Sequence, residues 1–159
     1  MENGTVTAGN SSPINDGAAA LMIVAGSYAD ANGLEPLGYV RSWCAAGVEP
    51  KNTGIAPTIA IPRALERAGI TQDQLSLVEI NEAFASMTVA CIKILGLDPE
   101  IVNVNGGAVG LGHPVGASGA RLIVTMLHEL RRRGGGFGVA SLCAGGGMGG
   151  AAVIEVPSA

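Results

Sequence analysis

Apolar and polar positions divide the chain into short apolar runs and longer stretches with helical spacing. Apolar runs are typical of buried strands, and they occur at residues 18–25, 37–45, 75–80, 101–104, 138–142 and 151–156. Helical patterns lie between several of them, at residues 28–32, 59–68 and 118–133 and in a stretch that ends at residue 95. This alternation predicts an α/β fold: a mixed, mostly parallel sheet of about five strands with helices on both faces and an antiparallel last strand.

Glycines are most concentrated between residues 103 and 120, which read Asn-Val-Asn-Gly-Gly-Ala-Val-Gly-Leu-Gly-His-Pro-Val-Gly-Ala-Ser-Gly-Ala. Glycines let the backbone adopt positive φ angles and let another group approach main-chain amides. His113 is the only side chain in this stretch that exchanges a proton near neutral pH. The pattern predicts a loop that presents one imidazole between a strand and a helix. A structural histidine bonded to nearby carbonyls is the alternative.

Three of the predicted strands end at Asn81, at the loop of His113 and at Cys143. Because ligands of α/β sheets bind at the carboxyl ends of strands, we expect an amide, an imidazole and a thiol to meet in one crevice. Asn81 can instead be a helix N-cap, which would put Glu82 at the first helical position. Cys143 can be a buried, inert thiol. If it is reactive, the amides of the following glycine run are expected to lower its pKa.

The composition points to contact with another protein or domain. Hydrophobic residues make up 48% of the chain and charged residues 14%, with a mean hydropathy of +0.40. These values argue against disorder and predict a large apolar contact face. A net charge of −4 with 9 Lys and Arg argues against binding to nucleic acid. The three arginines at 131–133 are expected to close a helix, and His128 to lie on the surface.

Several other classes of protein do not fit the sequence. No apolar run approaches the roughly 18 residues of a membrane span, and the polar, acidic start Met-Glu-Asn-Gly-Thr differs from a signal peptide. The three cysteines and two histidines lack the spacing of a metal site, and the odd number of cysteines indicates a reducing compartment. We therefore expect a cytoplasmic protein. A dinucleotide fingerprint at residues 110–116 has its third glycine one residue late, and no P-loop is present.

Four segments together resemble the thiolase family. They are Thr-Val-Thr-Ala-Gly-Asn-Ser-Ser-Pro-Ile-Asn-Asp-Gly at 5–17, Asn-Glu-Ala-Phe-Ala at 81–85, Gly-Gly-Ala-Val-Gly-Leu-Gly-His-Pro-Val-Gly-Ala-Ser-Gly-Ala-Arg at 106–121 and Leu-Cys-Ala-Gly-Gly-Gly-Met-Gly at 142–149. The last three resemble the C-terminal signatures of thiolases. The resemblance implies that residues 18–159 form a thiolase C-terminal domain and that residues 1–17 lead in from an N-terminal half.

The resemblance also implies roles for individual residues. His113 would activate the nucleophilic cysteine and, with a water held by Asn81, bind the thioester oxygen as it becomes an enolate. Cys143 would remove and return the α-proton of the second acyl-CoA. The amide of Gly145 would contribute to the oxyanion hole of the acyl-enzyme. Three further residues would line the pantetheine path: Ser12, Ala8 and Phe84.

The acyl-accepting cysteine of thiolases lies in their N-terminal half, and neither Cys44 nor Cys91 has a matching context. The resemblance therefore implies the C-terminal catalytic half of an acyl-CoA C-acyltransferase that acts on 3-ketoacyl-CoA, such as acetoacetyl-CoA, and that is inactive alone. Its expected partners are an N-terminal thiolase half and further copies in a homo- or hetero-oligomer. CoA thioesters would be substrates, with no permanently bound cofactor. The alternative is a non-catalytic subunit that binds acyl-CoA or assembles a thiolase-like complex, and a nucleotide-binding domain is a third interpretation.

Overall fold

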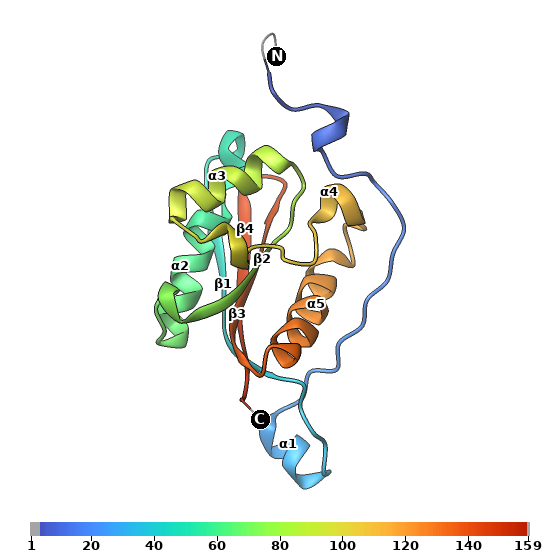
Figure 1. Cartoon of the computed structure of the whole chain (residues 1–159), viewed down its shortest axis with the longest axis vertical. Helices are drawn as coiled ribbons and strands as arrows, with labels where there is room; N and C mark the ends of the chain where they lie inside the picture. The colour runs from blue at the N-terminus through green and yellow to red at the C-terminus, as the bar shows by residue number, and fades with distance from the viewer. Residues whose placement is uncertain (1–3, 159) are drawn as a thin grey trace.

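One sheet of four strands forms the centre of the computed structural model, which describes residues 4–158 (Figure 1). Residues 1–3 of the predicted leading segment lie outside this range. The strands lie in the order β1-β4-β3-β2, and their bounds are β1 (Tyr39–Gly47), β2 (Leu75–Ile80), β3 (Gly136–Ala144) and β4 (Met148–Val156). The predicted α/β class with a mixed sheet is confirmed.

The strand directions differ from the predicted mostly parallel arrangement. Only β2 and β3 are parallel, whereas β4 is antiparallel to both β1 and β3. The physical reason is the short glycine turn at residues 145–147, since a turn of this length can join only antiparallel strands. Met148 already pairs with Ala144, so the turn is shorter than the glycine run.

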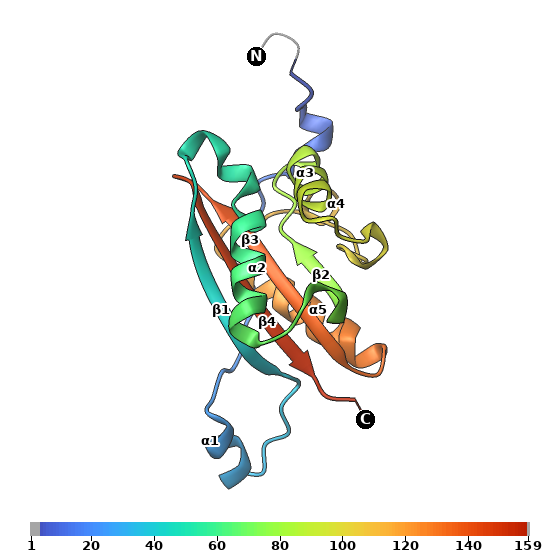
Figure 2. The same cartoon turned by 90° about the vertical axis from the view of Figure 1, so that its left-hand side faces the viewer.

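Helices cover both faces of the sheet, as predicted (Figures 1 and 2). One face packs against α2 (Pro57–Ala68) and α3 (Ala85–Leu95), and the other packs against α5 (Ser118–Arg132). Gly69 and Gly96 end α2 and α3 with φ angles of 71° and 64°, a conformation that glycine adopts without strain. The shorter helices are α1 (Gly26–Ala31), α4 (Ala108–Leu111), η1 (Ala8–Asn10), η2 (Pro50–Ile55), η3 (Gln72–Gln74) and η4 (Pro99–Ile101).

The strand predicted at residues 18–25 is wrong. This segment is irregular and runs along the outside of the molecule to α1 (Figure 1). Met22 and Ile23 are 78% and 76% exposed, because no strand in residues 4–158 pairs with them. The predicted helix at 28–32 exists as α1, but it begins two residues earlier, at Gly26. The apolar run therefore has the composition of a buried strand, but it pairs with no strand of residues 4–158.

The strand predicted at residues 101–104 is also wrong. It is reduced to one bridge, between Val78 and Val102, and the sheet has four strands rather than about five. Asn103 turns the chain with a φ of 48°. Its side chain then bonds both the N–H and the carbonyl of Ile80, at 2.8 and 2.9 Å. These two side-chain hydrogen bonds take the place of the backbone hydrogen bonds that a full strand would form with β2.

The charged end of α5 is occupied by ion pairs within the chain. Arg132 and Arg133 both pair with Glu129, and Arg131 lies 3.8 Å from Glu35. The arginines thus close a helix as predicted, and His128 is exposed as predicted. Within residues 4–158, no helix has the length and apolar character that crossing a membrane requires.

Candidate active site

Strand β2 places Asn81 beside the imidazole of His113. The Asn81 N–H donates to the Ser141 carbonyl at 2.9 Å, which extends the pairing of β2 with β3 by one residue. The Asn81 side chain is buried, and its Nδ2 lies 3.3 Å from Nε2 of His113. Asn81 does not cap α3, whose N-cap is Phe84, so the capping alternative is wrong.

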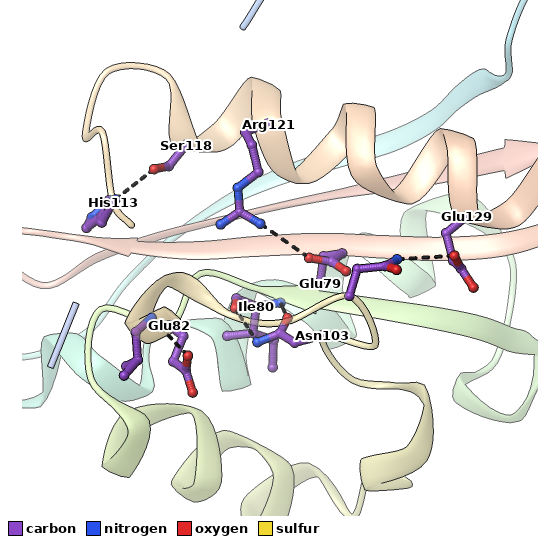
Figure 3. A network of polar contacts seen from close by, with 10 residues as sticks. Glu79, Ile80, Glu82, Asn103, His113, Ser118, Arg121 and Glu129 are labelled. Atoms are coloured by element: carbon purple, nitrogen blue, oxygen red, sulfur yellow. Dashed lines mark hydrogen bonds and ion pairs between the residues drawn. The ribbon is translucent and has the colours of Figure 1, made fainter. Parts of the chain in front are cut away.

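His113 is held on both its backbone and its ring. Its N–H donates to Oδ1 of Asn15 at 2.7 Å, and its Nδ1 lies 2.7 Å from Oγ of Ser118 (Figure 3). Ser118 is fully buried at the start of α5, and its Oγ also lies 3.1 Å from the Pro114 carbonyl. Because the single Ser118 hydroxyl proton goes to the Pro114 carbonyl, Oγ accepts from Nδ1–H, and Nε2 of the neutral ring accepts from Nδ2 of Asn81. Burial, and after it the positive charge of Arg121, hold the pKa of His113 below its usual value.

The side chains of Asn81 and His113 are placed so that both can donate to one oxygen. Once Nε2 has taken up a proton, the two nitrogens are donors 3.3 Å apart, and one oxygen in front of them can accept from both. Donors fixed before charge develops stabilise an oxyanion without reorganising. Asn81 Oδ1 is buried and has no hydrogen-bond partner within residues 4–158, so this amide is held mainly by its Nδ2 contact.

Glu82 braces the loop that carries His113. Its Oε2 accepts a hydrogen bond from the Val109 N–H at 3.1 Å, at the amino end of α4. A carboxylate there complements the free amides of the helix. Gly107 is required beside it, because a Cβ at that position would overlap the Glu82 carboxylate. Glu82 precedes α3 rather than opening it, so its expected place at the first helical position is wrong.

Cys143 lies near the carboxyl end of β3, on the side of the sheet that faces α3. Its Sγ is 3.4 Å from Sδ of Met87. The thiol opens onto a pocket of about 390 Å³ lined by Val6, Lys51, Asn52, Thr53, Gly54, Ile55, Phe84, Ser86 and Met87. Burial raises the pKa of Cys143, contrary to the expected lowering by the glycine run. The thiol is therefore protonated at neutral pH, a state suited to donating a proton.

Of the three predicted pantetheine residues, Phe84 is the one that lines this pocket. The Ser12 N–H donates to the Ala83 carbonyl at 2.9 Å. Ala8 is exposed in η1, and the residue that lines the pocket from this segment is Val6. Gly145 is exposed in the turn between β3 and β4.

The other two cysteines differ from Cys143 in their burial. Cys44 and Cys91 are buried, and burial raises the pKa of Cys91 to about 11, with Cys143 adding to the rise. Within the part of the chain that the structure describes, no group of three or more His, Cys, Asp or Glu side chains is arranged to hold a metal ion.

The sequence reasoning missed three residues that position His113: Asn15, Ser118 and Glu82 in this role. Ser118 lies five residues after the histidine, where a buried hydroxyl at a helix start can return to the loop. Asn15 is 98 positions away from His113 in the sequence, so no local pattern indicates it. Glu82 was noted only for its place beside a helix, and its actual partner is a different helix.

Comparison with known proteins agrees with this fold. The family model "Thiolase, C-terminal domain" matches residues 34–156, and "Thiolase, N-terminal domain" matches residues 1–27. The chain therefore belongs to the thiolase family. It is 56% identical to 3-ketoacyl CoA thiolase 1, peroxisomal, of Petunia hybrida over 96% of this chain and 34% of the relative. It is 54% identical to an acetyl-CoA acetyltransferase of Shinella zoogloeoides over 97% of this chain and 39% of the relative.

Solved structures of relatives have the same fold. The acetyl-CoA acetyltransferase of Bacillus anthracis superposes with a TM-score of 0.94 at 50% identity, over 96% of this chain and 39% of that one. Human mitochondrial 3-ketoacyl-CoA thiolase in complex with CoA gives a TM-score of 0.91 at 40% identity, over 98% of this chain and 40% of that one. The chain thus spans between a third and two-fifths of the length of the relatives it matches.

Proposed function

We propose that this chain is the C-terminal catalytic part of an acyl-CoA C-acyltransferase that forms or cleaves 3-ketoacyl-CoA, acetoacetyl-CoA among them. The observation that carries the proposal is the contact between Asn81 Nδ2 and His113 Nε2, two potential donors at the edge of the sheet where β3 also presents Cys143. This arrangement supports chemistry that develops charge on a thioester oxygen beside a proton donor and acceptor.

In the condensation direction, Cys143 first gives its thiol proton to the CoA thiolate that leaves when the nucleophilic cysteine is acylated. The resulting Cys143 thiolate then takes the α-proton of the second acyl-CoA and becomes a thiol again. The electron pair of the broken C–H bond moves onto the thioester oxygen, which His113 and a water held by Asn81 stabilise. The enolate carbon then attacks the acyl group on the nucleophilic cysteine of the N-terminal half. A carbon–carbon bond forms, the carbon–sulfur bond to that cysteine breaks, and the thiolate leaves. Cleavage reverses these steps, with Cys143 as the acid.

The remaining predicted residues complete this proposal. His113 helps to deprotonate the nucleophilic cysteine: its lowered pKa keeps the imidazole neutral, Nε2 accepts the proton, and the N–H formed there can then donate to the thioester oxygen. The amide of Gly145 contributes to the oxyanion hole of the acyl-enzyme. Ser12, Ala8 and Phe84 line the pantetheine path, supported by the position of Phe84 in the pocket next to Cys143. The substrates are CoA thioesters, and no permanently bound cofactor is proposed.

An N-terminal thiolase half is the proposed partner. The apolar residues of the 18–25 segment are exposed, Met22 at 78% and Ile23 at 76%, although the segment has the composition of a buried strand. A sheet in the partner half that takes up this segment would bury it. Homo- or hetero-oligomers remain a prediction. So does the cytoplasmic location, since the names of relatives include peroxisomal enzymes.

The test combines this chain with the N-terminal half of a thiolase, such as that of the Shinella zoogloeoides enzyme, and measures acetoacetyl-CoA cleavage. We expect a stable complex with activity, and no activity from either part alone. If the mixture shows no complex and no activity, the proposal is rejected.

A non-catalytic subunit that binds acyl-CoA or assembles a complex is the second candidate. The observation that favours this second function is that Cys44 and Cys91 are both buried. Cys143 is therefore the least buried of the three cysteines. Cys143→Ala separates the two functions. It should abolish cleavage while leaving the complex intact if the chain is catalytic, whereas an assembly subunit forms the complex without any cleavage to lose.

A further inference from the structure

Two charged side chains lie unsatisfied beneath the Asn81–His113 pair. Glu79 on β2 is fully buried, and neither of its carboxylate oxygens has a hydrogen-bond partner within residues 4–158. Arg121 on α5 reaches toward it, with Nη1 at 3.8 Å from Oε2 of Glu79 (Figure 3). Both terminal nitrogens of Arg121 are buried and also lack hydrogen-bond partners in the described residues.

Stability does not account for this pair. Removing two charges from water is costly, and their attraction offsets that cost only when further hydrogen bonds satisfy the remaining lone pairs and protons. No group in residues 4–158 supplies those hydrogen bonds to the carboxylate oxygens of Glu79 or to the terminal nitrogens of Arg121. Burial raises the pKa of Glu79 to about 7, and Arg121 counteracts only part of the rise. A buried pair that does not strengthen the fold calls for another role.

The positions of the pair link it to the site. Side chains two apart on a strand point to the same face, so Glu79 lies next to Asn81 on the face that α5 covers. Side chains three apart on a helix are neighbours, so Arg121 lies next to Ser118, the partner of His113. The ion pair therefore joins β2 to α5 one step behind the residues that hold the imidazole and the amide.

The pair also places a positive charge near the imidazole. After burial, the Arg121 guanidinium is the second cause that keeps the pKa of His113 low. Glu79 is the carboxylate that faces this guanidinium, and Glu129 on α5 acts on Glu79 in turn. The other titratable groups on the segments around His113 are Asp16 in the N-terminal segment, Glu82 after β2 and Cys143 near the end of β3.

We propose that Glu79 and Arg121 are positioning residues for His113: Glu79 holds the guanidinium in place, and the guanidinium keeps the imidazole neutral and aligned with Asn81. The pair lowers stability in exchange for this alignment. Its catalytic consequence rests on the proposed function, whereas its effect on the imidazole does not.

The effect on the imidazole is measured by NMR titration of the ¹⁵N-labelled histidines in this chain. The only other histidine, His128, is exposed and serves as an internal reference, and His113→Gln assigns the signals. In the unmodified chain, His113 should titrate below the usual histidine value. Arg121→Met should raise the His113 midpoint by roughly 0.5 unit, and Arg121→Lys, which keeps the charge, should restore most of the difference.

A double variant keeps the test valid if a single substitution leaves one charge buried and unfolds the chain. Glu79→Leu combined with Arg121→Met replaces the pair by apolar side chains and should melt at the same or a higher temperature. It should nevertheless show the raised His113 midpoint. Arg63→Met, at an exposed position on α2 across the sheet, is the matched control and should leave His113 unchanged. A His113 midpoint within 0.1 unit of the parent in both Arg121→Met and the double variant would overturn the proposal.

The catalytic consequence is measured in the complex with the N-terminal half. Arg121→Met and the double variant should each lower kcat roughly tenfold with KM within twofold, and Arg121→Lys should recover most of kcat. If the parent complex is active and these variants match its kcat, the inference is wrong. If the parent complex has no activity while the His113 midpoint shifts as expected, the proposed function fails and the positioning role stands.

Discussion

The two faces of the sheet bury different chemistry. The face covered by α2 and α3 is apolar, and its buried polar side chains are hydroxyls such as Ser42, which donates to the Ala64 carbonyl at 2.6 Å. The face covered by α5 also has an apolar cluster, but it buries Glu79, Asn81 and Glu129 as well. The difference indicates that the α2 face mainly stabilises the fold, although Cys143 lies on it, whereas the α5 face gives up stability to hold Asn81 and His113.

The largest effect is expected from His113 itself. His113→Ala should lower the cleavage activity of the complex by about two to three orders of magnitude, because one of the two donors for the oxyanion is lost. The melting temperature should change little, since His113 is only partly buried in a loop. Steady-state kinetics with acetoacetyl-CoA and a thermal melt of the same sample check both statements. If His113→Ala keeps the parent activity, the α5 face takes no part in the reaction.

Substitutions on the α2 face should lower stability rather than act on the site. Ile61→Ala removes a fully buried side chain and should lower the free energy of unfolding by about 2 to 5 kcal/mol through lost burial and a cavity. Ile59, on the same helix and 37% exposed, is the matched control, and its replacement by Ala should cost about 1 kcal/mol or less. Urea unfolding measures both. If Ile61→Ala and Ile59→Ala lower the free energy of unfolding equally, the α2 face does not contribute a buried core.

The buried carboxyl of Glu79 should make stability depend on pH. Its pKa is raised from 4.5 to about 7 in the folded chain. Below pH 4.5 the group is protonated in both states; as the pH rises toward 7, the unfolded state ionises first and the folded state loses stability. The loss is about 3 kcal/mol, since each pH unit between 4.5 and 7 costs about 1.4 kcal/mol. Urea midpoints between pH 4.5 and 8 should show this decline in the parent chain and a weaker one in Glu79→Gln. Identical slopes would contradict the burial of an ionisable group on the α5 face.

The smallest effect concerns the brace of the His113 loop. Gly107→Ala places a Cβ against the Glu82 carboxylate and should displace α4, which precedes His113. We expect a roughly tenfold loss of kcat. Gly110 lies in the same short helix with open space around it, so Gly110→Ala is the control and should have little effect on kcat. If both variants have the same kcat, Glu82 does not position the loop.

Local patterns predicted the elements whose partners are built into the chain. Strand β2 has its predicted bounds, and α2 and α3 end before the predicted glycines. The run at 18–25 misled because its composition encodes burial but not what buries it, and no strand of residues 4–158 does so. The run at 101–104 misled because the side chain of Asn103 supplies the hydrogen bonds that a strand backbone would make.

The proximity of Asn81 and His113 followed from the rule that ligands bind at strand ends, even though the strand expected before His113 is only a bridge. Asn15 could not be predicted, because it approaches His113 through a fold-dependent contact. The direction of the Cys143 pKa was wrong for a related reason. Burial against Met87 depends on how α3 packs, and this effect outweighs the local amides.

The central claim is that the Asn81–His113 pair and Cys143 act on one acyl-CoA. The most direct measurement is exchange of the α-protons of acetyl-CoA in D₂O, followed by NMR in the complex of this chain with an N-terminal thiolase half. Exchange should be rapid in the parent complex and should fall by about two orders of magnitude or more in Asn81→Ala and in Cys143→Ala. Exchange at the parent rate in both variants would contradict the claim.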